Sequence, residues 1–466
     1  MGGAENKPAE PDLGNASEGS AMSHETPNWG IEPVPERLRV LGLFDTSLLW
    51  SSLGLSLLVL VAGTLLVPAL SLGDALLAIV VGGLVGNAML AFAGLIGAQA
   101  RVPAMVLLRA PLGRRGSYLA TVLNVVQNLG WTVFELIVIA TAAAALSQRV
   151  FGFHAIWLWT LIAAAATTAL ALLGPVGFVR RWVKPFAIWV VLASLAYLTW
   201  WALHDAGLHR LWSRSGEGGL GFWGGVDLMI AMPVSWLPLA ADYTRFSRSR
   251  SRAFWGTGLG YLLPNVWLYG LGAVLLLSKN LADATSLMTK IATGGLAGGL
   301  ALFALLVDET KEPFANVYST ALSLQNLVPR ASQRMLILIA ASVSTVGALA
   351  IDLAQYQTFL FLLGSFFVPL FGVLAADWLV RRGYNWDAVF RAPSLRLAQL
   401  GAWLAGFALY QWLTPTGPSW WVDVVAHLHP TSWGYGSSLP SFALAFALSA
   451  LLSVLARARA RSSSAA

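Results

Sequence analysis

The residues of this chain best suited to chemistry are charged side chains set inside long apolar segments. The stretch NVVQNLGWTVFELIVIA carries Trp131 and Glu135, which are four residues apart and therefore share one face of a helix. An indole can stack on a planar heterocycle, and a carboxylate one turn away can accept hydrogen bonds from donors on its edge. The alternative is a Trp packed between helices beside a Glu bonded to a neighbouring helix. A charge at mid-membrane depth costs roughly 2.5 to 3.5 kcal/mol, so the pair favours a binding role.

A second group of charges lies in the segment LLVDETKEPFANVYSTALSLQNL. Asp308, Glu312 and Asn316 follow one another at four-residue spacing on one stripe, and Lys311 can reach Asp308. Pro313 cannot donate to the carbonyl four residues before it, which leaves an acceptor for a cation or for a substrate donor. The alternative is that Lys311 and the acids only neutralise one another between helices.

Two further segments are candidates for broken helices, whose half-helix ends bind ions and substrates in many transporters. FDTSLLWSSLGLSLL places Trp50, Ser51 and Ser52 at the middle of its apolar run. GGVDLMIAMPVSWLPLAADYTRF holds two prolines, the first of them Pro233, that interrupt the hydrogen-bond ladder around Ser235. Interruptions at matching positions of two halves indicate a binding site more strongly than either one alone.

The composition requires these segments to lie in a membrane. The chain has 466 residues, of which 57% are hydrophobic and 11% charged, and its mean hydropathy is +0.68. Soluble domains carry about 25% charged residues, so a soluble enzyme with a single anchor is excluded. Apolar runs predict twelve membrane helices, numbered here as spans 1 to 12: 44–70, 74–99, 117–147, 155–176, 185–204, 222–244, 254–278, 295–326, 333–351, 356–380, 396–413 and 440–457.

The placement of Lys and Arg predicts the topology of these spans. With a cytoplasmic N-terminus, 23 of the 29 Lys and Arg residues fall on the inner side, five fall outside and Lys311 lies within span 8. We therefore expect a multi-pass protein of the cytoplasmic membrane with both termini in the cytoplasm. The formal charge of +7 then reflects topology and lipid contact, not nucleic-acid binding.

Signals for other chemistry are absent from the sequence. The chain has no cysteine, and it contains no Walker loop, no HExxH motif and no dinucleotide fingerprint. No cofactor and no metal site are expected. The first forty residues hold no apolar signal core, and we expect a disordered cytoplasmic tail there.

Several of these segments resemble a known family. PNWGIEPVPERLR, span 1, LGRRGSYLA, SWLPLAADYTRF and FANVYSTALSLQN are similar to the cytosine/purine/hydantoin permeases, the nucleobase:cation symporters. The leader and span 1 are most similar to the CytX subgroup, which is assigned to hydroxymethylpyrimidine transport. The resemblance covers about residues 28 to 390.

The resemblance implies an all-α, LeuT-like fold with a five-plus-five inverted repeat and broken helices in spans 1 and 6. The implied divisions are a tail over 1–40, a first repeat over 41–206, a second repeat over 221–381, two additional helices over 396–457 and a cytoplasmic tail over 458–466.

The resemblance also implies substrate-binding residues. In the family, a span 3 Trp and the polar residue four positions later hold the planar ring, and they match Trp131 and Glu135. Glu replaces the amide of the hydantoin carrier, and a carboxylate suits an aminopyrimidine edge better than an imide. The set predicted from motifs and resemblance together is Trp50, Trp131, Glu135, Met232, Pro233, Ser235, Glu312 and Asn316. Pro233 stands where the hydantoin carrier has a Trp.

The coupling ion is where the chain departs from sodium-coupled members. Two small residues of span 8 ligate Na⁺ there together with span 1 carbonyls, and they match Thr310 and Lys311. The ion-coupling residues expected here are these two with Ser51 and Ser52. A Lys ammonium would occupy or repel a sodium site, which favours H⁺ over Na⁺ or ion-independent transport.

The sequence thus predicts a secondary transporter that imports a planar base by alternating access. A pyrimidine such as hydroxymethylpyrimidine or cytosine is the expected substrate. An amino-acid or amine transporter of the same fold and an intramembrane enzyme are the alternatives. The exact base, the stoichiometry, the direction of transport and the oligomeric state stay open.

Overall fold

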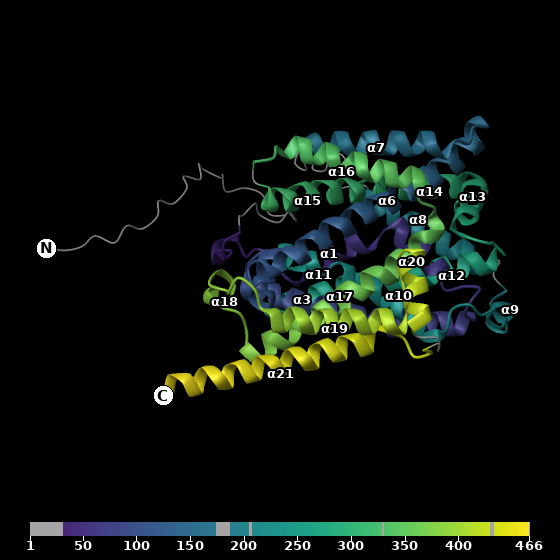
Figure 1. Cartoon of the computed structure of the whole chain (residues 1–466). Coiled ribbons are helices and arrows are strands. Elements are labelled where there is room, and N and C mark those ends of the chain that lie inside the picture. Colours follow the sequence, from purple (N-terminus) through teal and green to yellow (C-terminus); the bar gives the residue numbers. More distant parts are fainter. Residues whose placement is uncertain (1–30, 174–186, 205–206, 329, 429–432, 466) are drawn as a thin grey trace.

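The molecule is a bundle of long helices, most of them aligned with one another (Figure 1). The computed structural model describes residues 31–173, 187–204, 207–328, 330–428 and 433–465. The first half of the chain contains α1 (Leu43–Gly54), α2 (Leu57–Thr64), α3 (Leu72–Ala100), α4 (Ala104–Leu107), α5 (Arg109–Leu112), α6 (Gly116–Phe151), α7 (Ile156–Leu173), α8 (Ala187–His204) and α9 (Leu208–Trp212).

The second half of the chain also consists mainly of helices. It contains α10 (Phe222–Ser235), α11 (Leu237–Thr244), α12 (Arg250–Ser278), α13 (Ala284–Thr293), α14 (Gly295–Glu309), α15 (Lys311–Leu327), α16 (Gln333–Ala350), α17 (Tyr356–Arg381), α18 (Trp386–Phe390), α19 (Leu397–Leu413), α20 (Ser419–Leu428) and α21 (Ser438–Ala465).

Every predicted span falls on a helix or on a pair of helices separated by a short break. Positions 174–176 and 185–186, at the ends of predicted spans 4 and 5, lie outside the described residues. Within the described ranges, six helices are long and apolar enough to cross a membrane, and eight spans result if each bent pair counts as one. The chain is therefore a multi-pass membrane protein, while the number of twelve spans stays a prediction.

The two predicted broken helices are confirmed. In span 1, α1 and α2 are bent by 59° at Leu55–Ser56, and in span 6, α10 and α11 are bent by 40° at Trp236. A third break divides span 8 at Thr310, between α14 and α15, and Pro313 is the third residue of α15. The proline is tolerated there because the first amides of a helix have no partner within it.

The helices form two groups that meet at the broken spans. One group consists of α6, α7, α15 and α16, which pack on one another along one side of the molecule (Figure 1). In the other group, α3 packs on α10 and α12, and α12 also packs on α1 and α2. The helix α17 packs on α10 and joins α19 and α21 to this second group.

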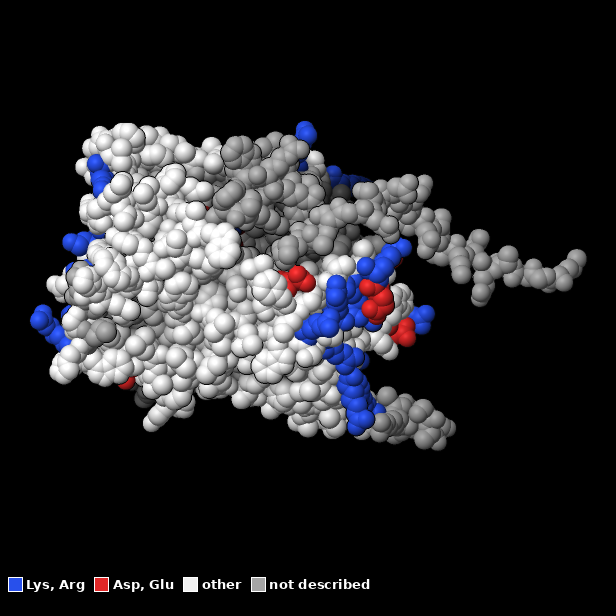
Figure 2. Space-filling model, turned by 180° about the vertical axis from the view of Figure 1, so that it is seen from behind, with Lys and Arg blue, Asp and Glu red and all other residues white. Residues whose placement is uncertain are grey.

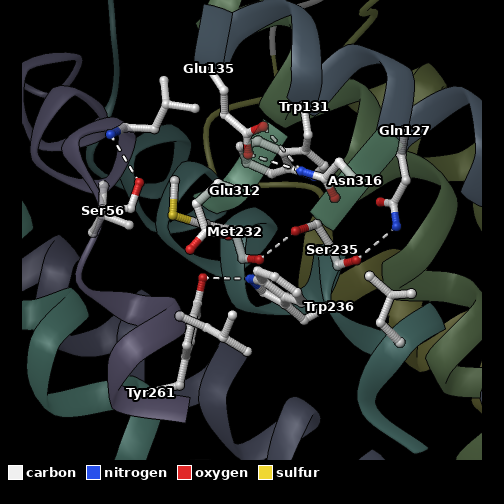
Figure 3. Close-up of a pocket in the computed structure, with 14 residues that line it drawn as sticks. Ser56, Gln127, Trp131, Glu135, Met232, Ser235, Trp236, Tyr261, Glu312 and Asn316 are labelled. Atoms are coloured by element: carbon white, nitrogen blue, oxygen red, sulfur yellow. Dashed lines mark hydrogen bonds between the residues drawn. The ribbon is translucent and has the colours of Figure 1, made fainter. Parts of the chain in front are cut away.

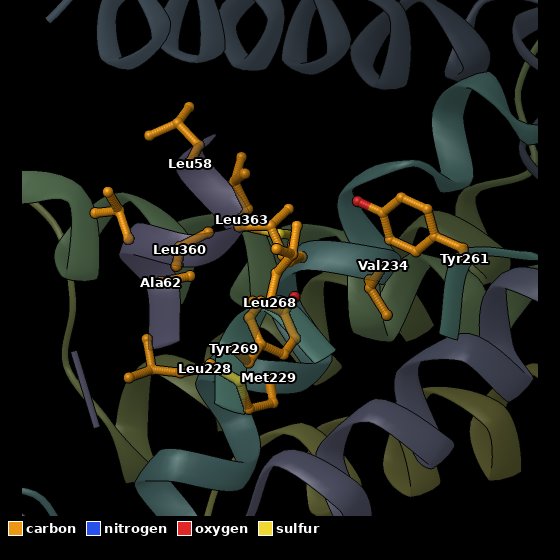
Figure 4. Close-up of a cluster of buried hydrophobic side chains, with 14 of the residues drawn as sticks. Leu58, Ala62, Leu228, Met229, Val234, Tyr261, Leu268, Tyr269, Leu360 and Leu363 are labelled. Atoms are coloured by element: carbon orange, nitrogen blue, oxygen red, sulfur yellow. The ribbon is translucent and has the colours of Figure 1, made fainter. Parts of the chain in front are cut away.

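The apolar core lies where α2, α10, α12 and α17 meet. Figure 4 shows its members in one cluster, among them Leu58, Ala62, Leu228, Met229, Leu268, Tyr269, Leu360 and Leu363. The backbones of α2 and α12 approach closely, because a Cβ atom on Gly63 would lie 2.0 Å from the carbonyl oxygen of Tyr269. Small residues permit such contacts between membrane helices, and they hold α2 against α12.

Charged side chains are concentrated at one end of the bundle. Figure 2 shows Lys and Arg gathered there, while the side of the molecule between its two ends is almost free of charge in this view. The described ion pairs at this end include Arg101–Glu36, Arg381–Asp377 and Arg396–Asp377. An uncharged belt between polar ends is what a bilayer requires.

Candidate substrate-binding site

A pocket lined by buried and half-buried residues lies between the broken helices and α6. Its lining is largely apolar or aromatic, with a few polar groups, as is typical of small-molecule sites. The lining residues are Leu53, Ser56, Leu58, Val59, Gln127, Trp131, Glu135, Met232, Ser235, Trp236, Leu239, Tyr261, Glu312 and Asn316 (Figure 3). Six of the predicted substrate-binding residues are in this lining: Trp131, Glu135, Met232, Ser235, Glu312 and Asn316.

The centre of one wall is formed by α6. The rings of Tyr356 and Phe359 contact Trp131 edge-on, with centroids 6.1 Å and 5.2 Å away, and these contacts hold the indole at the pocket. One turn further, Glu135 is 4% exposed and accepts hydrogen bonds from the amide nitrogen of Asn316 at 2.9 Å and 3.2 Å. This contact joins α6 to α15 and presents a carboxylate and an amide beside the indole.

Glu312 adds a second acidic group to the same wall. It lies one turn before Asn316 on α15, its side chain is 5% exposed, and its Oε1 has no hydrogen-bond partner within the described structure. Buried polar atoms in native proteins nearly always have a partner, so an unpaired oxygen at a pocket marks a group available to a ligand or a proton.

The break of span 1 is held by charged side chains from span 8. The carboxylate of Glu309 accepts hydrogen bonds from the backbone amide of Leu57 at 2.6 Å and from the Ser56 hydroxyl at 2.9 Å. The Nζ of Lys311 donates to the Ser52 carbonyl at 3.1 Å and to Asp308 at 2.7 Å. The ion pair predicted between Lys311 and Asp308 is therefore confirmed.

These contacts match the polarity of the helix ends. The first amides of α2 carry partial positive charge and are bonded to a carboxylate, whereas the carbonyl of Ser52, in the last turn of α1, is bonded to an ammonium. One turn of span 8 thus satisfies both ends of the break with opposite charges.

The break of span 6 is held by neutral groups. Gln127 of α6 donates from Nε2 to the Ser235 carbonyl at 3.0 Å, and the Ser235 hydroxyl donates to the Met232 carbonyl at 2.7 Å. Trp236, at the break itself, donates from Nε1 to the Tyr261 hydroxyl at 2.7 Å. The aromatic group that span 6 contributes to the pocket is therefore Trp236, three residues after Pro233.

The other predicted site residues lie away from the pocket lining. Trp50 is fully buried behind the pocket, where Trp236, Tyr243 and Tyr261 contact it edge-on with centroids 5.8 to 5.9 Å away. Pro233 is buried within α10. The side-chain hydroxyls of the predicted ion-coupling residues are all bonded to backbone carbonyls: Ser51 to Gly260, Ser52 to Leu49 and Thr310 to Val307. Of that set, the structure brings together only Lys311 and the carbonyl of Ser52.

Five polar or aromatic contributors were not among the predicted site residues: Ser56, Gln127, Trp236, Tyr261 and Glu309. Gln127 precedes Trp131 by four residues, so the stripe that predicted Trp131 and Glu135 could have included it. Glu309 lies in the charged stretch of span 8, so the cost of a buried charge could have indicated it, although not which helix end it would meet. No comparable local signal exists for Tyr261, because its role depends on contacts with other helices.

The arrangement suits a flat, polar molecule. The indoles of Trp131 and Trp236, one on each side of the pocket, can stack on the faces of a ring. Carboxylate and amide groups can form hydrogen bonds with the polar edge of that ring. Within the part of the chain that the structure describes, no group of three or more His, Asp or Glu side chains is placed to hold a metal ion.

Comparisons with known proteins agree with this geometry. Residues 33–415 match the family model described as permease for cytosine/purines, uracil, thiamine and allantoin. Among curated proteins, the cytosine permease of Escherichia coli K12 is 25% identical over 413 residues, which cover 83% of this chain and 89% of that protein.

Solved structures show the same fold. Mhp1, a nucleobase-cation-symport-1 family transporter, in a closed conformation with bromovinylhydantoin bound, has a TM-score of 0.71 at 21% identity, covering 93% of this chain and 95% of its own. The inward-facing conformation of Mhp1 has a TM-score of 0.72 at 20% identity, covering 92% and 93%. A manganese transporter of Eremococcus coleocola has a TM-score of 0.56 at 13% identity, covering 91% and 97%.

Proposed function

Since the chain belongs to the family of permeases for cytosine/purines, uracil, thiamine and allantoin, and is a transporter rather than an enzyme, we propose that it imports an aminopyrimidine by alternating access. Cytosine and hydroxymethylpyrimidine are the two candidates. The observation that carries this proposal is the buried Glu135–Asn316 pair beside Trp131 in the lining of the pocket.

The chemistry of that group supports an aminopyrimidine. The ring stacks on Trp131, with Trp236 on the other side of the pocket, and the exocyclic amine donates to Glu135. The Asn316 amide, which bonds Glu135 at 2.9 Å, provides a donor and an acceptor within reach of the same edge. An imide edge would place carbonyl oxygens against the carboxylate, so hydantoin and uracil fit this edge less well.

The amino-acid alternative is disfavoured by the start of α2. A transporter that recognises a substrate carboxylate with a half-helix needs free backbone amides at the helix N-terminus. Here the amide of Leu57 donates to Glu309 at 2.6 Å, and the amide of Leu58 lies 3.4 Å from the same carboxylate. A substrate carboxylate would therefore meet a fixed negative group.

The contacts of Lys311 support transport that does not use sodium. The resemblance to sodium-coupled members assigns the sodium ligands to span 1 carbonyls and to the positions of Thr310 and Lys311. The Lys311 ammonium bonds the Ser52 carbonyl at 3.1 Å and supplies there the positive charge that the ion would supply. We propose proton coupling, with Glu312 as the group that exchanges the proton, because its Oε1 lines the pocket without a partner.

Thermal stabilisation of the purified full chain tests the proposed function. Cytosine, hydroxymethylpyrimidine, uracil, adenine, hydantoin and amino acids are added singly, each with and without Na⁺. A ligand that binds only the folded state raises the free energy of unfolding by RT ln(1 + [L]/Kd), and the unfolding temperature rises with it. We expect a shift for an aminopyrimidine that Na⁺ does not change. A shift for amino acids alone would overturn the substrate assignment, and a sodium-dependent shift would overturn the role of Lys311.

A further inference from the structure

The pocket contains an acceptor that none of the groups above uses. Gln127 is 1% exposed and lines the pocket, yet its Oε1 has no hydrogen-bond partner within the described structure. A buried amide oxygen almost always has one. No protein group in the described structure occupies this oxygen, so it is available to a ligand donor.

The orientation of this amide is set by its neighbours. Nε2 donates to the Asn124 side-chain oxygen at 2.9 Å and to the Ser235 carbonyl at 3.0 Å, which uses both hydrogens of the amide. The Ser235 carbonyl can only accept, so turning the amide over would place two oxygens against each other. Oε1 must then point away from Ser235, and Figure 3 shows it on the side facing Trp131 and Asn316.

The helix break explains why Ser235 needs this donor. Ser235 is the last residue of α10, where carbonyls lose their helical partners. The amide of Leu239, four residues after Ser235, donates at 2.9 Å to the backbone carbonyl of Trp236. Residue 238 is a proline without an amide hydrogen, so neither residue donates to the Ser235 carbonyl. Gln127 replaces the missing partner, and its own oxygen is held in position as a result.

The spacing along α6 places this oxygen at a definite edge of the substrate. Gln127, Trp131 and Glu135 are four residues apart, and a helix rises 1.5 Å per residue, so each lies about 6 Å from the next along one face. A ring stacked on Trp131 therefore has one edge toward Glu135 and Asn316 and the opposite edge toward Gln127.

We infer that Gln127 is a specificity-determining residue whose Oε1 accepts a hydrogen bond from a donor on the substrate edge opposite the one that Glu135 and Asn316 contact. The substrate class is then a heterocycle with donors on two opposite edges. Cytosine has this pattern, with its exocyclic amine on one side of the ring and its ring N1–H on the other. This inference rests on the proposed function and, because hydroxymethylpyrimidine has no ring N–H opposite its amine, it selects cytosine from the two candidates.

The test combines a change in the protein with a change in the ligand. Binding of cytosine and of 1-methylcytosine, which lacks the N1–H donor, is measured by calorimetry on the purified full chain, the Gln127→Met variant and a control. Met has a similar length to Gln and lacks the amide oxygen. The control is Gln148→Met, an exposed position on the same helix outside the pocket.

We expect the unmodified protein to prefer cytosine over 1-methylcytosine by roughly 10-fold or more, the loss that one buried hydrogen bond produces. Gln127→Met should weaken cytosine binding by about the same factor and leave 1-methylcytosine within about 3-fold. Gln148→Met should change neither. The result is thus a loss of preference, which a general loosening of the pocket does not produce.

Two outcomes would overturn the inference. If Gln127→Met weakens the binding of both ligands equally, Gln127 only donates a hydrogen bond to the Ser235 carbonyl and does not contact the substrate. If cytosine binds the variant as it binds the unmodified protein, Oε1 does not contact the substrate, although the proposed function stands. Failure of the unmodified protein to bind any pyrimidine overturns the proposed function, and this inference with it.

Discussion

The breaks in span 1 and span 6 are similar in geometry and different in chemistry. Both divide an apolar helix near the pocket, with bends of 59° and 40°. The span 1 break is held by the charged side chains of Glu309 and Lys311, both from span 8. The span 6 break is held by neutral hydrogen bonds from Gln127 of α6 and by the contact of Trp236 with Tyr261.

This difference indicates that one break serves ion coupling and the other serves substrate recognition. A charged contact in a low-dielectric setting is sensitive to protons and to cations, so the span 1 break suits coupling. Neutral hydrogen bonds orient groups without adding charge, so the span 6 break suits recognition of an uncharged ring. Substitutions at the first break should alter stability and ion dependence, and those at the second should alter affinity.

The largest effect is expected from Glu309→Ala. The substitution leaves the buried amide of Leu57 without its acceptor, which costs about 1–3 kcal/mol, and it removes the acceptor of the Ser56 hydroxyl. The amide of Leu58 keeps the Ser56 hydroxyl as its acceptor at 3.1 Å. The thermal midpoint of the purified protein should fall markedly, whereas Glu309→Gln, which keeps an acceptor oxygen, should lose much less. Equal midpoints for the two variants would show that this cap does not hold the span 1 break.

Lys311→Thr should have the next largest effect. It breaks the bond to Ser52 and leaves Asp308 without its ammonium, and since the Lys side chain is 30% exposed the stability loss should be about 1–3 kcal/mol. Uptake into vesicles should become sodium-dependent or stop. Lys290→Thr, an exposed position in α13, is the matched control. Sodium-dependent uptake by the unmodified protein would contradict the assigned role.

Glu312→Gln should separate binding from coupling. The amide keeps the size of the side chain and cannot exchange a proton, so substrate should still bind and still exchange across the membrane. Accumulation driven by an imposed pH gradient should be lost. The measurement compares substrate exchange with gradient-driven uptake in the same vesicles. Retained accumulation would show that a group other than Glu312 exchanges the proton.

Glu135→Gln should keep the fold and reduce substrate binding. A hydrogen bond to a charged group contributes about 1.5–3 kcal/mol, so affinity for an aminopyrimidine should fall by roughly 10- to 100-fold. Calorimetry measures the loss, and the thermal midpoint without ligand serves as the control. Normal uptake by this variant would show that the Glu135 carboxylate does not bind the substrate.

The smallest effect is expected from Trp236→Phe. Phe keeps an aromatic face for the substrate, loses the 2.7 Å bond from Nε1 to the Tyr261 hydroxyl, and reduces the edge-on contact with Trp50. That bond should be worth about 0.5–1.5 kcal/mol of stability, with a change in affinity of less than about 10-fold. A much larger loss of affinity would show that the indole itself, and not just an aromatic ring, is required.

Local patterns predicted a large part of this architecture. Within the described residues the apolar runs matched helices, and the prolines and small residues of spans 1 and 6 correctly indicated broken helices. Glu135 and Glu312 were found because charge inside an apolar run is costly at any position along it. Trp131 and Asn316 were found because they lie four residues from these acids on the same helix face. The division into two inverted repeats and the cytoplasmic placement of both termini stay predictions.

Hydropathy, the prolines and small residues within apolar runs, and the four-residue spacing of polar side chains are properties of the chain itself. They determined the membrane class, the broken spans and one stripe of the site. Only the tertiary structure decided that Trp50 lies behind the pocket, that Trp236 lines it, and that Glu309 and Lys311 bond the two ends of the span 1 break. These contacts join residues far apart in sequence, Leu57 and Glu309 by 252 positions, and no local pattern specifies which helix end a buried charge will meet.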